Sequence, residues 1–128
     1  MIASQTTILE VHPVISAKNM EESICFYQDK LGFTLKFSHA AVPGDPVDYA
    51  GLERGAFSLH LQAMVPGQDD AMPLIRVRVE NIEPLHEEHV AKGVVAETGQ
   101  LEPKPWGTKE FGLYDHNGAA IVFYEDFQ

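Results

Sequence analysis

Hydrophobic and polar positions along the chain follow two periods, and together these periods predict a strand followed by a helix. Residues 9–16 alternate as a strand does. Between Asn19, a favourable N-cap residue, and Gly32, a favourable helix end, apolar residues recur at helical spacing. This apolar stripe consists of Met20, Ile24, Tyr27 and Leu31.

The same plan recurs in the second half of the chain. Residues 74–80 are expected to form a strand, Asn81 to cap a helix and Gly93 to end it. The residues expected on the inner side of this helix are Ile82, Leu85, His86 and Val90. Asn81 minus Asn19 is 62 and Gly93 minus Gly32 is 61, so the sequence predicts two copies of one unit of nearly constant length.

Three extended segments are expected after each helix. They are residues 34–38, 47–52 and 57–64 in the first half, and 94–97, 109–114 and 119–124 in the second. We therefore expect an α+β fold of two βαβββ modules, about 8–65 and about 73–126, joined by the turn-rich segment 65–73. Residues 1–128 are expected to form a single domain.

Alternation along the strands predicts which side chains face the helices. The helix-facing set is apolar throughout: Val11, Ile15, Leu59, Leu61, Ile75, Val77, Val79, Ile121 and Phe123. The opposite set is mixed: His12, Val14, Ser16, Ser58, His60, Gln62, Leu74, Arg76, Arg78, Ala120, Val122 and Tyr124. A solvated sheet surface is one interpretation of this face, but polar and aromatic residues among apolar ones on four strands favour a small-molecule cleft.

Composition narrows the class of partner. The formal net charge of −10 repels phosphate backbones and anionic membrane surfaces, so neither nucleic acid nor membrane is an expected partner. We see no signal peptide in the N-terminal residues and therefore expect a cytoplasmic protein. The only cysteine, Cys25, lies in the apolar helical stretch, where we expect a buried structural thiol.

Two sequence segments resemble the glyoxalase/bleomycin-resistance/dioxygenase superfamily, also called the vicinal oxygen chelate superfamily. The first begins with His12-Pro-Val-Ile15 and continues through residues 19–27 to Leu31-Gly-Phe33. The second, residues 105–118, is similar to the Trp-Gly, Glu-Phe, Asp-x-x-Gly segment of bleomycin-resistance proteins. The resemblance implies two βαβββ modules curling into an open barrel-like cleft, and a homodimer that in many members exchanges modules.

Enzymes of this superfamily resemble one another in holding a divalent metal with residues of the first and last strands of each module. His12 and His60 match those positions in the first module, but adding 62 gives Leu74 and Val122 in the second. Neither can coordinate a metal, so we expect no cofactor and no catalytic residue. His86 and His89 lack the metalloprotease spacing and are expected to be solvated.

The leading hypothesis is a metal-free binding protein that sequesters an aromatic or amphipathic small molecule, as in antibiotic or toxin resistance. Trp106 and Tyr49 are similar to positions where bleomycin-binding relatives place aromatic rings. Arg76 and Arg78 would favour an anionic ligand unless acidic neighbours neutralise them. The complete predicted ligand-binding set is His12, Tyr49, His60, Gln62, Arg76, Arg78, Trp106 and Tyr124.

Two alternatives remain open. One is a metal-dependent lyase, isomerase or dioxygenase that uses His12 and His60 with a further ligand. The other is a structural or regulatory module whose cleft is occluded.

Overall fold

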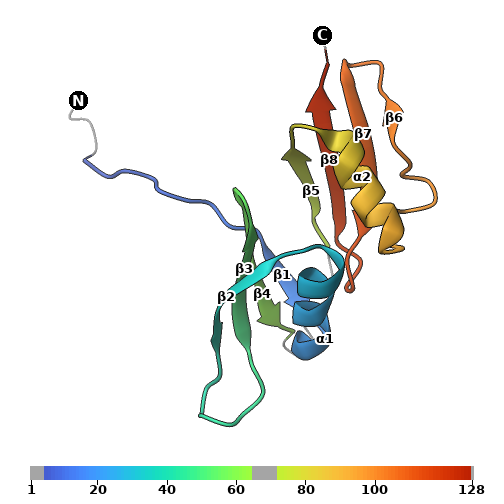
Figure 1. Cartoon of the computed structure of the whole chain (residues 1–128). Coiled ribbons are helices and arrows are strands. Elements are labelled where there is room, and N and C mark those ends of the chain that lie inside the picture. The colour runs from blue at the N-terminus through green and yellow to red at the C-terminus, as the bar shows by residue number, and fades with distance from the viewer. Residues whose placement is uncertain (1–4, 65–71, 128) are drawn as a thin grey trace.

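The computed structural model describes residues 5–64 and 72–127, so most of the predicted linker lies outside the described residues. The first half comprises β1 (Val14–Ala17), α1 (Met20–Cys25), a π-helical continuation η1 (Phe26–Lys30), β2 (Thr34–His39), β3 (Tyr49–Arg54) and β4 (Phe57–Ala63) (Figure 1). The second half comprises β5 (Leu74–Arg78), α2 (Ile82–Ala91), β6 (Glu102–Pro103), β7 (Thr108–Tyr114) and β8 (Ala120–Asp126).

Each half forms its own four-stranded sheet. The strand orders are β1-β4-β3-β2 and β5-β8-β7-β6. In both sheets the first and last strands are parallel and the other pairs are antiparallel. Val14 pairs with His60 and Arg76 with Val122, so both partners are displaced by the same 62 positions between the halves. The predicted α+β fold and its repeat are therefore confirmed, and the two sheets do not close into a barrel.

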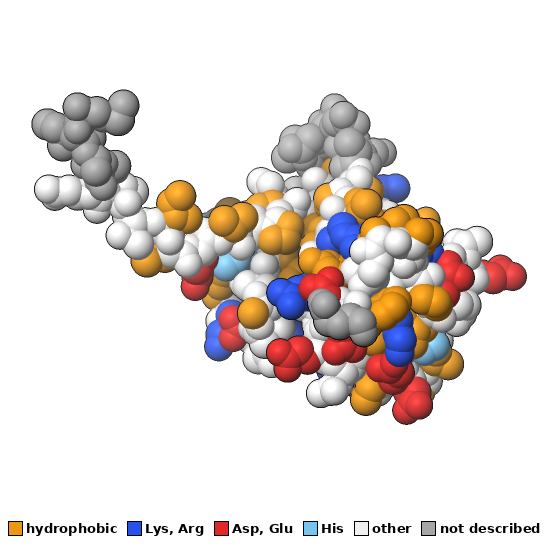
Figure 2. Space-filling view, turned by 90° about the horizontal axis from the view of Figure 1, so that it is seen from above, with side chains coloured by type: hydrophobic (Ala, Val, Ile, Leu, Met, Phe, Trp, Pro, Cys, Tyr) orange, Lys and Arg blue, Asp and Glu red, His pale blue; other side chains and the backbone are white. Residues whose placement is uncertain are grey.

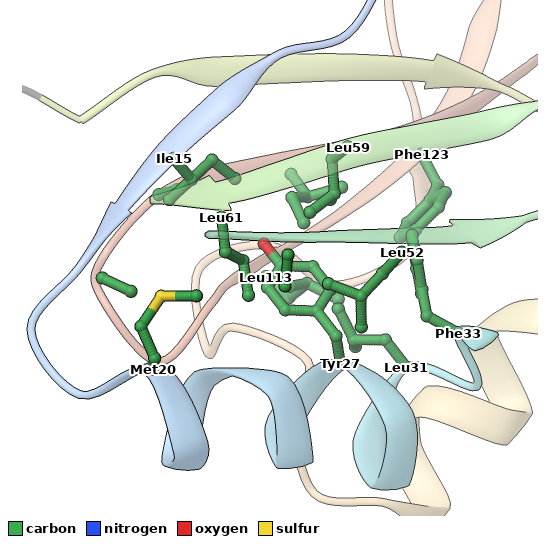
Figure 3. Packing of buried hydrophobic residues seen from close by; sticks show 14 of the residues in the cluster. Ile15, Met20, Tyr27, Leu31, Phe33, Leu52, Leu59, Leu61, Leu113 and Phe123 are labelled. Carbon is green, nitrogen blue, oxygen red and sulfur yellow. The ribbon is translucent and has the colours of Figure 1, made fainter. Parts of the chain in front are cut away.

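One hydrophobic cluster joins the two halves. Side chains of α1 and η1 pack beneath the first sheet, with Leu113 and Phe123 of the second sheet in the same cluster (Figure 3). Tyr27 is fully buried there, and its hydroxyl donates a hydrogen bond of 2.7 Å to Asp115 Oδ2. Burying a large apolar side chain contributes about 1.5–3 kcal/mol, so this shared core fixes the halves against each other.

The two helices begin differently. Asn19 caps α1 as predicted, because its side-chain oxygen accepts a hydrogen bond of 3.0 Å from the Glu22 amide. The predicted side-chain cap by Asn81 is wrong, since this residue adopts a left-handed conformation with φ of 60°. The carboxylate of Glu125 instead accepts hydrogen bonds from the amides of Asn81 and Ile82, at 3.0 and 3.1 Å. The cap of α2 therefore comes from β8 and not from the local sequence.

Two strand predictions were wrong, one because no strand pairs with the segment and one because its pairing with β7 is limited to a single bridge. Residues 9–13 are extended but belong to no sheet, and Val11, predicted to face the helices, is 83% exposed. Within segment 94–97 only Val95 forms a bridge, to Leu113. The outer strand of the second sheet is β6, which lies after that segment. Alternation predicts an extended chain, but a strand also requires an edge to pair with.

Three burial predictions also fail. His89 is 1% exposed and packs against both Phe111 and Phe123, while its Nδ1 lies 2.8 Å from the carbonyl oxygen of Leu85. It thereby takes the inner position predicted for Val90, which is exposed. Cys25 is exposed because α1 and η1 bury Ser23 and Tyr27, and the residue midway between them turns toward solvent.

Candidate functional site

The face of the first sheet opposite the helices carries a stack of aromatic rings. His12 lies on His60 with ring centroids 4.4 Å apart and an interplanar angle of 15°. Tyr49 on β3 reaches His60 on β4, and the Tyr49 hydroxyl and His60 Nδ1 are 2.9 Å apart. Phe37 on β2 meets the His60 ring edge-on at 5.3 Å. The imidazole of His60 is thus surrounded by His12, Tyr49 and Phe37. The sequence analysis predicted the first two as site residues but not Phe37.

This face borders a hollow of about 430 Å³, lined in part by His12, Phe37, Gly51 and His60. Gly51 leaves room for the Phe37 ring, because a Cβ at that position would lie 2.2 Å from Phe37 Cε1 and this half-exposed ring would have to move. Burial lowers the pKa of His60, the charge of nearby His12 lowers it further, and Glu10 partly opposes the shift. This environment therefore favours a neutral His60, whose ring lines the hollow together with the Phe37 ring and the polar side chains of Glu10 and Lys36.

The corresponding face of the second sheet is organised around Glu110, which the sequence analysis missed. Its carboxylate accepts two hydrogen bonds from Arg76, at 3.1 and 2.7 Å. It also accepts one from Trp106 Nε1 at 2.9 Å and one from the Thr108 hydroxyl at 2.7 Å. With its side chain only 6% exposed, Glu110 holds three neighbouring side chains in fixed positions.

Electrostatics keep this carboxylate ionised. The hydrogen bonds from Arg76, followed by those from Thr108 and Trp106, outweigh burial and lower the pKa of Glu110 to about 2. The guanidinium of Arg76 also lies over the Tyr124 ring, 4.5 Å from its centroid. The result is an ordered array of carboxylate, guanidinium and two aromatic rings.

Trp106 combines exposure with a fixed orientation. Its residue surface is 65% exposed, yet its indole N–H is held by Glu110. An aromatic ring that is oriented before binding loses little conformational freedom when a ligand stacks on it. Trp106 is therefore suited to act as a stacking surface.

The two arginines are not free to pair with a ligand anion. Arg76 is paired with Glu110, and Arg78 Nε lies 3.1 Å from Asp126 Oδ2. Acidic neighbours therefore neutralise both arginines, which weakens the expectation of an anionic ligand. A planar uncharged or cationic group suits this face at least as well.

The structure groups the predicted residues by sheet. His12, Tyr49 and His60 cluster on the first sheet, while Arg76, Trp106 and Tyr124 cluster on the second. Gln62 pairs with Tyr49 along the backbone and has an exposed side chain. Arg78 also belongs to the second sheet but pairs with Asp126 and not with Glu110. The internal repeat could have indicated Glu110 as a site residue, because Glu110 pairs with Tyr124 just as Tyr49 pairs with Gln62.

Among the described residues, no helix is long and apolar enough to span a lipid bilayer.

Comparison with known families gives one match over most of the chain. Residues 11–123 match the model of the Glyoxalase/Bleomycin resistance protein/Dioxygenase superfamily. A search of curated protein sequences found no match.

Solved structures show the same fold. TioX from Micromonospora sp. ML1 is 16% identical with a TM-score of 0.75, over 92% of this chain and 100% of that one. A bleomycin resistance determinant encoded on transposon Tn5 is 18% identical with a TM-score of 0.72, over 94% and 100%. The bleomycin-binding protein from Streptomyces verticillus, complexed with copper(II)-bleomycin, is 26% identical with a TM-score of 0.68, over 97% and 100%.

The residues at the family's metal positions do not fit a metal ion. Leu74 and Val122 have no coordinating atom, and β5 and β8 place them opposite Ala120 and Arg76 respectively. Across residues 5–64 and 72–127, no cluster of three or more His, Cys, Asp or Glu side chains could hold a metal. Two imidazoles and the exposed Glu10 are a weak set for a catalytic centre.

Proposed function

This chain belongs to the Glyoxalase/Bleomycin resistance protein/Dioxygenase superfamily, and we propose that it is a metal-free binding protein that sequesters an aromatic or amphipathic small molecule. The observation that carries this proposal is Trp106, which is largely exposed and yet oriented by the buried carboxylate of Glu110. A surface tryptophan fixed in this way is suited to recognition more than to packing.

Two further contacts support a planar ligand. Arg76 already stacks on Tyr124, so the face offers delocalised groups at two neighbouring positions. Because Glu110 neutralises Arg76, a ligand that approaches meets little net charge. The relative from Streptomyces verticillus was crystallised with copper(II)-bleomycin, which makes bleomycin a reasonable first probe.

Fluorescence titration tests this proposal directly, because Trp106 is the only tryptophan in the chain. Metal-free bleomycin, copper(II)-bleomycin and planar aromatic cations and anions serve as probes. We expect at least one probe to change the Trp106 emission with saturation. Measured by calorimetry, Trp106→Ala should lower the affinity for that probe by about tenfold. This is equivalent to ~1.4 kcal/mol and lies near the upper end for aromatic stacking.

A matched control is Tyr114→Ala, which removes an exposed aromatic residue from the end of β7. It should leave the affinity unchanged. Equal affinity of wild type and Trp106→Ala for the best probe would exclude the stacking role. Elemental analysis of protein purified without chelator addresses the metal-dependent alternative: a stoichiometric transition metal that disappears in His60→Ala would favour an enzyme.

A further inference from the structure

The side of α2 that packs on the second sheet carries two histidines. The helix lies across β7 and β8 (Figure 1), and the rings of His86 and His89 both pack against Phe111 of β7. The buried residues of α2 are Ile82 and His89. Residues 20–30, which form α1 and η1, contain no histidine. Of the two helical segments, α2 is therefore the one whose packing surface can take up protons in mild acid.

The hydrogen bond of His89 fixes its tautomer. The Nδ1 atom lies 2.8 Å from the carbonyl oxygen of Leu85. Because a carbonyl oxygen can only accept a hydrogen bond, Nδ1 carries the proton and Nε2 carries the lone pair. Nε2 is buried and has no hydrogen-bond partner within residues 5–64 and 72–127. A second proton would therefore be added at a nitrogen for which this part of the chain offers no acceptor.

The surroundings of the His89 ring do little to stabilise an imidazolium. Phe111 and Phe123 cover it from the sheet side and carry no charge. The titratable and charged groups that face it from α2 and β3 are His86, Glu88 and Arg54. Both His86 and Arg54 act against a positive charge, and only Glu88, 4.0 Å from Nδ1, favours one. Arg54 already engages the Glu88 carboxylate in hydrogen bonds of 2.6 and 2.9 Å.

Water cannot replace the missing acceptor while α2 stays in place. On the face of the molecule seen in Figure 2, charged side chains lie at the surface, where water solvates them. His89 is only 1% exposed. Because an unpaired charge is costly to bury, a protonated His89 and a closed α2 oppose each other.

We propose that protonation of His89 shifts α2 toward a form detached from the second sheet as the solution becomes mildly acidic. In the detached form water solvates the imidazolium, and the rings of Phe111 and Phe123 are uncovered. The ion pairs that also hold α2, Glu83 with Lys109 and Glu88 with Arg54, join groups at least a third exposed and stabilise the closed form little.

The direction of the pH dependence follows from the burial of His89, which lowers its pKa in the closed form. The detached form binds the proton more readily, so the closed form is fully stable above the unfolded pKa of about 6.5 and loses stability as pH falls below it. This shift goes beyond the proposed function, because α2 covers the side of the second sheet opposite to Trp106 and the shift needs no ligand.

Amide hydrogen exchange of the full chain without ligand, followed by mass spectrometry at pH 7 and pH 5, tests this proposal. After correction for the intrinsic pH dependence of exchange, the opening equilibrium of α2 should rise by up to about twentyfold. This is the factor expected when the open form takes up one proton with a pKa of about 6.5 and the closed form stays neutral. Amides of α1 and η1 serve as the internal reference and should keep their protection.

Two variants assign the effect to one imidazole. His89→Leu keeps an apolar side chain at the site but cannot titrate, so the protection of α2 should be equal at the two pH values. His39→Leu, which removes an exposed imidazole from β2, should keep the wild-type response. A dye that binds exposed apolar surface, 1-anilinonaphthalene-8-sulfonate, should bind wild type and His39→Leu at pH 5 more than His89→Leu.

Three results would overturn the proposal. They are equal protection of α2 at pH 7 and pH 5 in wild type, a loss shared equally by α1 and η1, and an unchanged response in His89→Leu. If circular dichroism shows that His89→Leu does not fold, the comparison of the two helical segments in wild type still decides. Since no ligand is used, a failure here leaves the Trp106 titration to decide the proposed function independently.

Discussion

The open faces of the two sheets, opposite the helices, have equivalent backbone registers but carry different side chains. Tyr49 stands opposite Gln62 in the first sheet, and Glu110 stands opposite Tyr124 in the second, so Tyr49 and Glu110 occupy equivalent places. Around Tyr49 the contacts are a hydrogen bond to His60 and ring stacking. Around Glu110 they are four charge-assisted or polar hydrogen bonds that converge on one carboxylate.

The difference shows that two repeated units can keep the same backbone geometry while the side chains on their open faces differ. Pairing register depends on strand length and turn position, which the two halves retain. The side chains on the open face contribute little to the core and are free to diverge. The second face holds Trp106 by a hydrogen bond while leaving it 65% exposed, whereas the exposed Phe37 ring of the first face has ring contacts alone, so the second face is the better candidate for ligand recognition.

Removing the carboxylate of Glu110 should have the largest effect. Glu110→Ala leaves Arg76 without its partner and frees the Trp106 indole. Losing one member of a buried pair costs about 3–5 kcal/mol, and because the Arg76 side chain is 42% exposed we expect about 2 kcal/mol in the free energy of unfolding. Urea denaturation measures this loss, and the Trp106 emission of the folded variant should shift as the indole loses its partner.

Glu102→Ala is the matched control, because Glu102 pairs with Lys104, two residues further along the chain, but is well exposed. It should change the stability by less than about 1 kcal/mol. If the two variants were equally stable, Glu110 would not organise the second face.

Much of the fold could be predicted from sequence because it depends on local signals. The spacing of Asn19 and Gly32 against Asn81 and Gly93 predicted two units, and alternation assigned Leu59, Leu61 and Ile121 to the core correctly. These patterns need no knowledge of distant contacts.

Most of the missed features depend on contacts between distant segments. Glu125 caps α2 across 43 and 44 positions, and the bond from Arg76 to Glu110 spans 34. His89 is buried because two phenyl rings of the second sheet cover it, which helical periodicity alone could not distinguish from exposure. Of the candidate site, alternation supplied the two faces, but not the carboxylate that orders one of them.

The two faces should lose their contributions to stability in different pH ranges as the solution is acidified. The pKa of His60 is lowered in the fold, so the unfolded chain binds the proton more readily. The stability from a neutral His60 is complete above the unfolded pKa of about 6.5 and is lost as pH falls below it. Glu110 also has a lowered pKa, so its contribution is present above the ordinary value of 4.5 and is lost as pH falls toward about 2.

Denaturation at a series of pH values resolves these windows. His60→Gln should reduce the loss of stability just below neutral pH, leaving the part from His89, whose pKa burial also lowers. It should not alter the more acidic loss from Glu110. His39→Gln, at an exposed position on β2, provides the control. An unchanged profile in His60→Gln would show that the imidazole stack plays no part in acid sensitivity.

Tyr49→Phe should have the smallest effect and completes the comparison, because it alters the position equivalent to Glu110. The substitution removes the hydroxyl that meets His60 Nδ1 but keeps the ring beside Phe37, 6.2 Å between centroids. One half-buried hydrogen bond is worth about 0.5–1.5 kcal/mol, so we expect a loss near the lower end in urea denaturation. Tyr114→Phe, at an exposed tyrosine, controls for the loss of a hydroxyl. A loss as large as that of Glu110→Ala would mean that the first face is also ordered by one central side chain, and the contrast between the two sheets would fail.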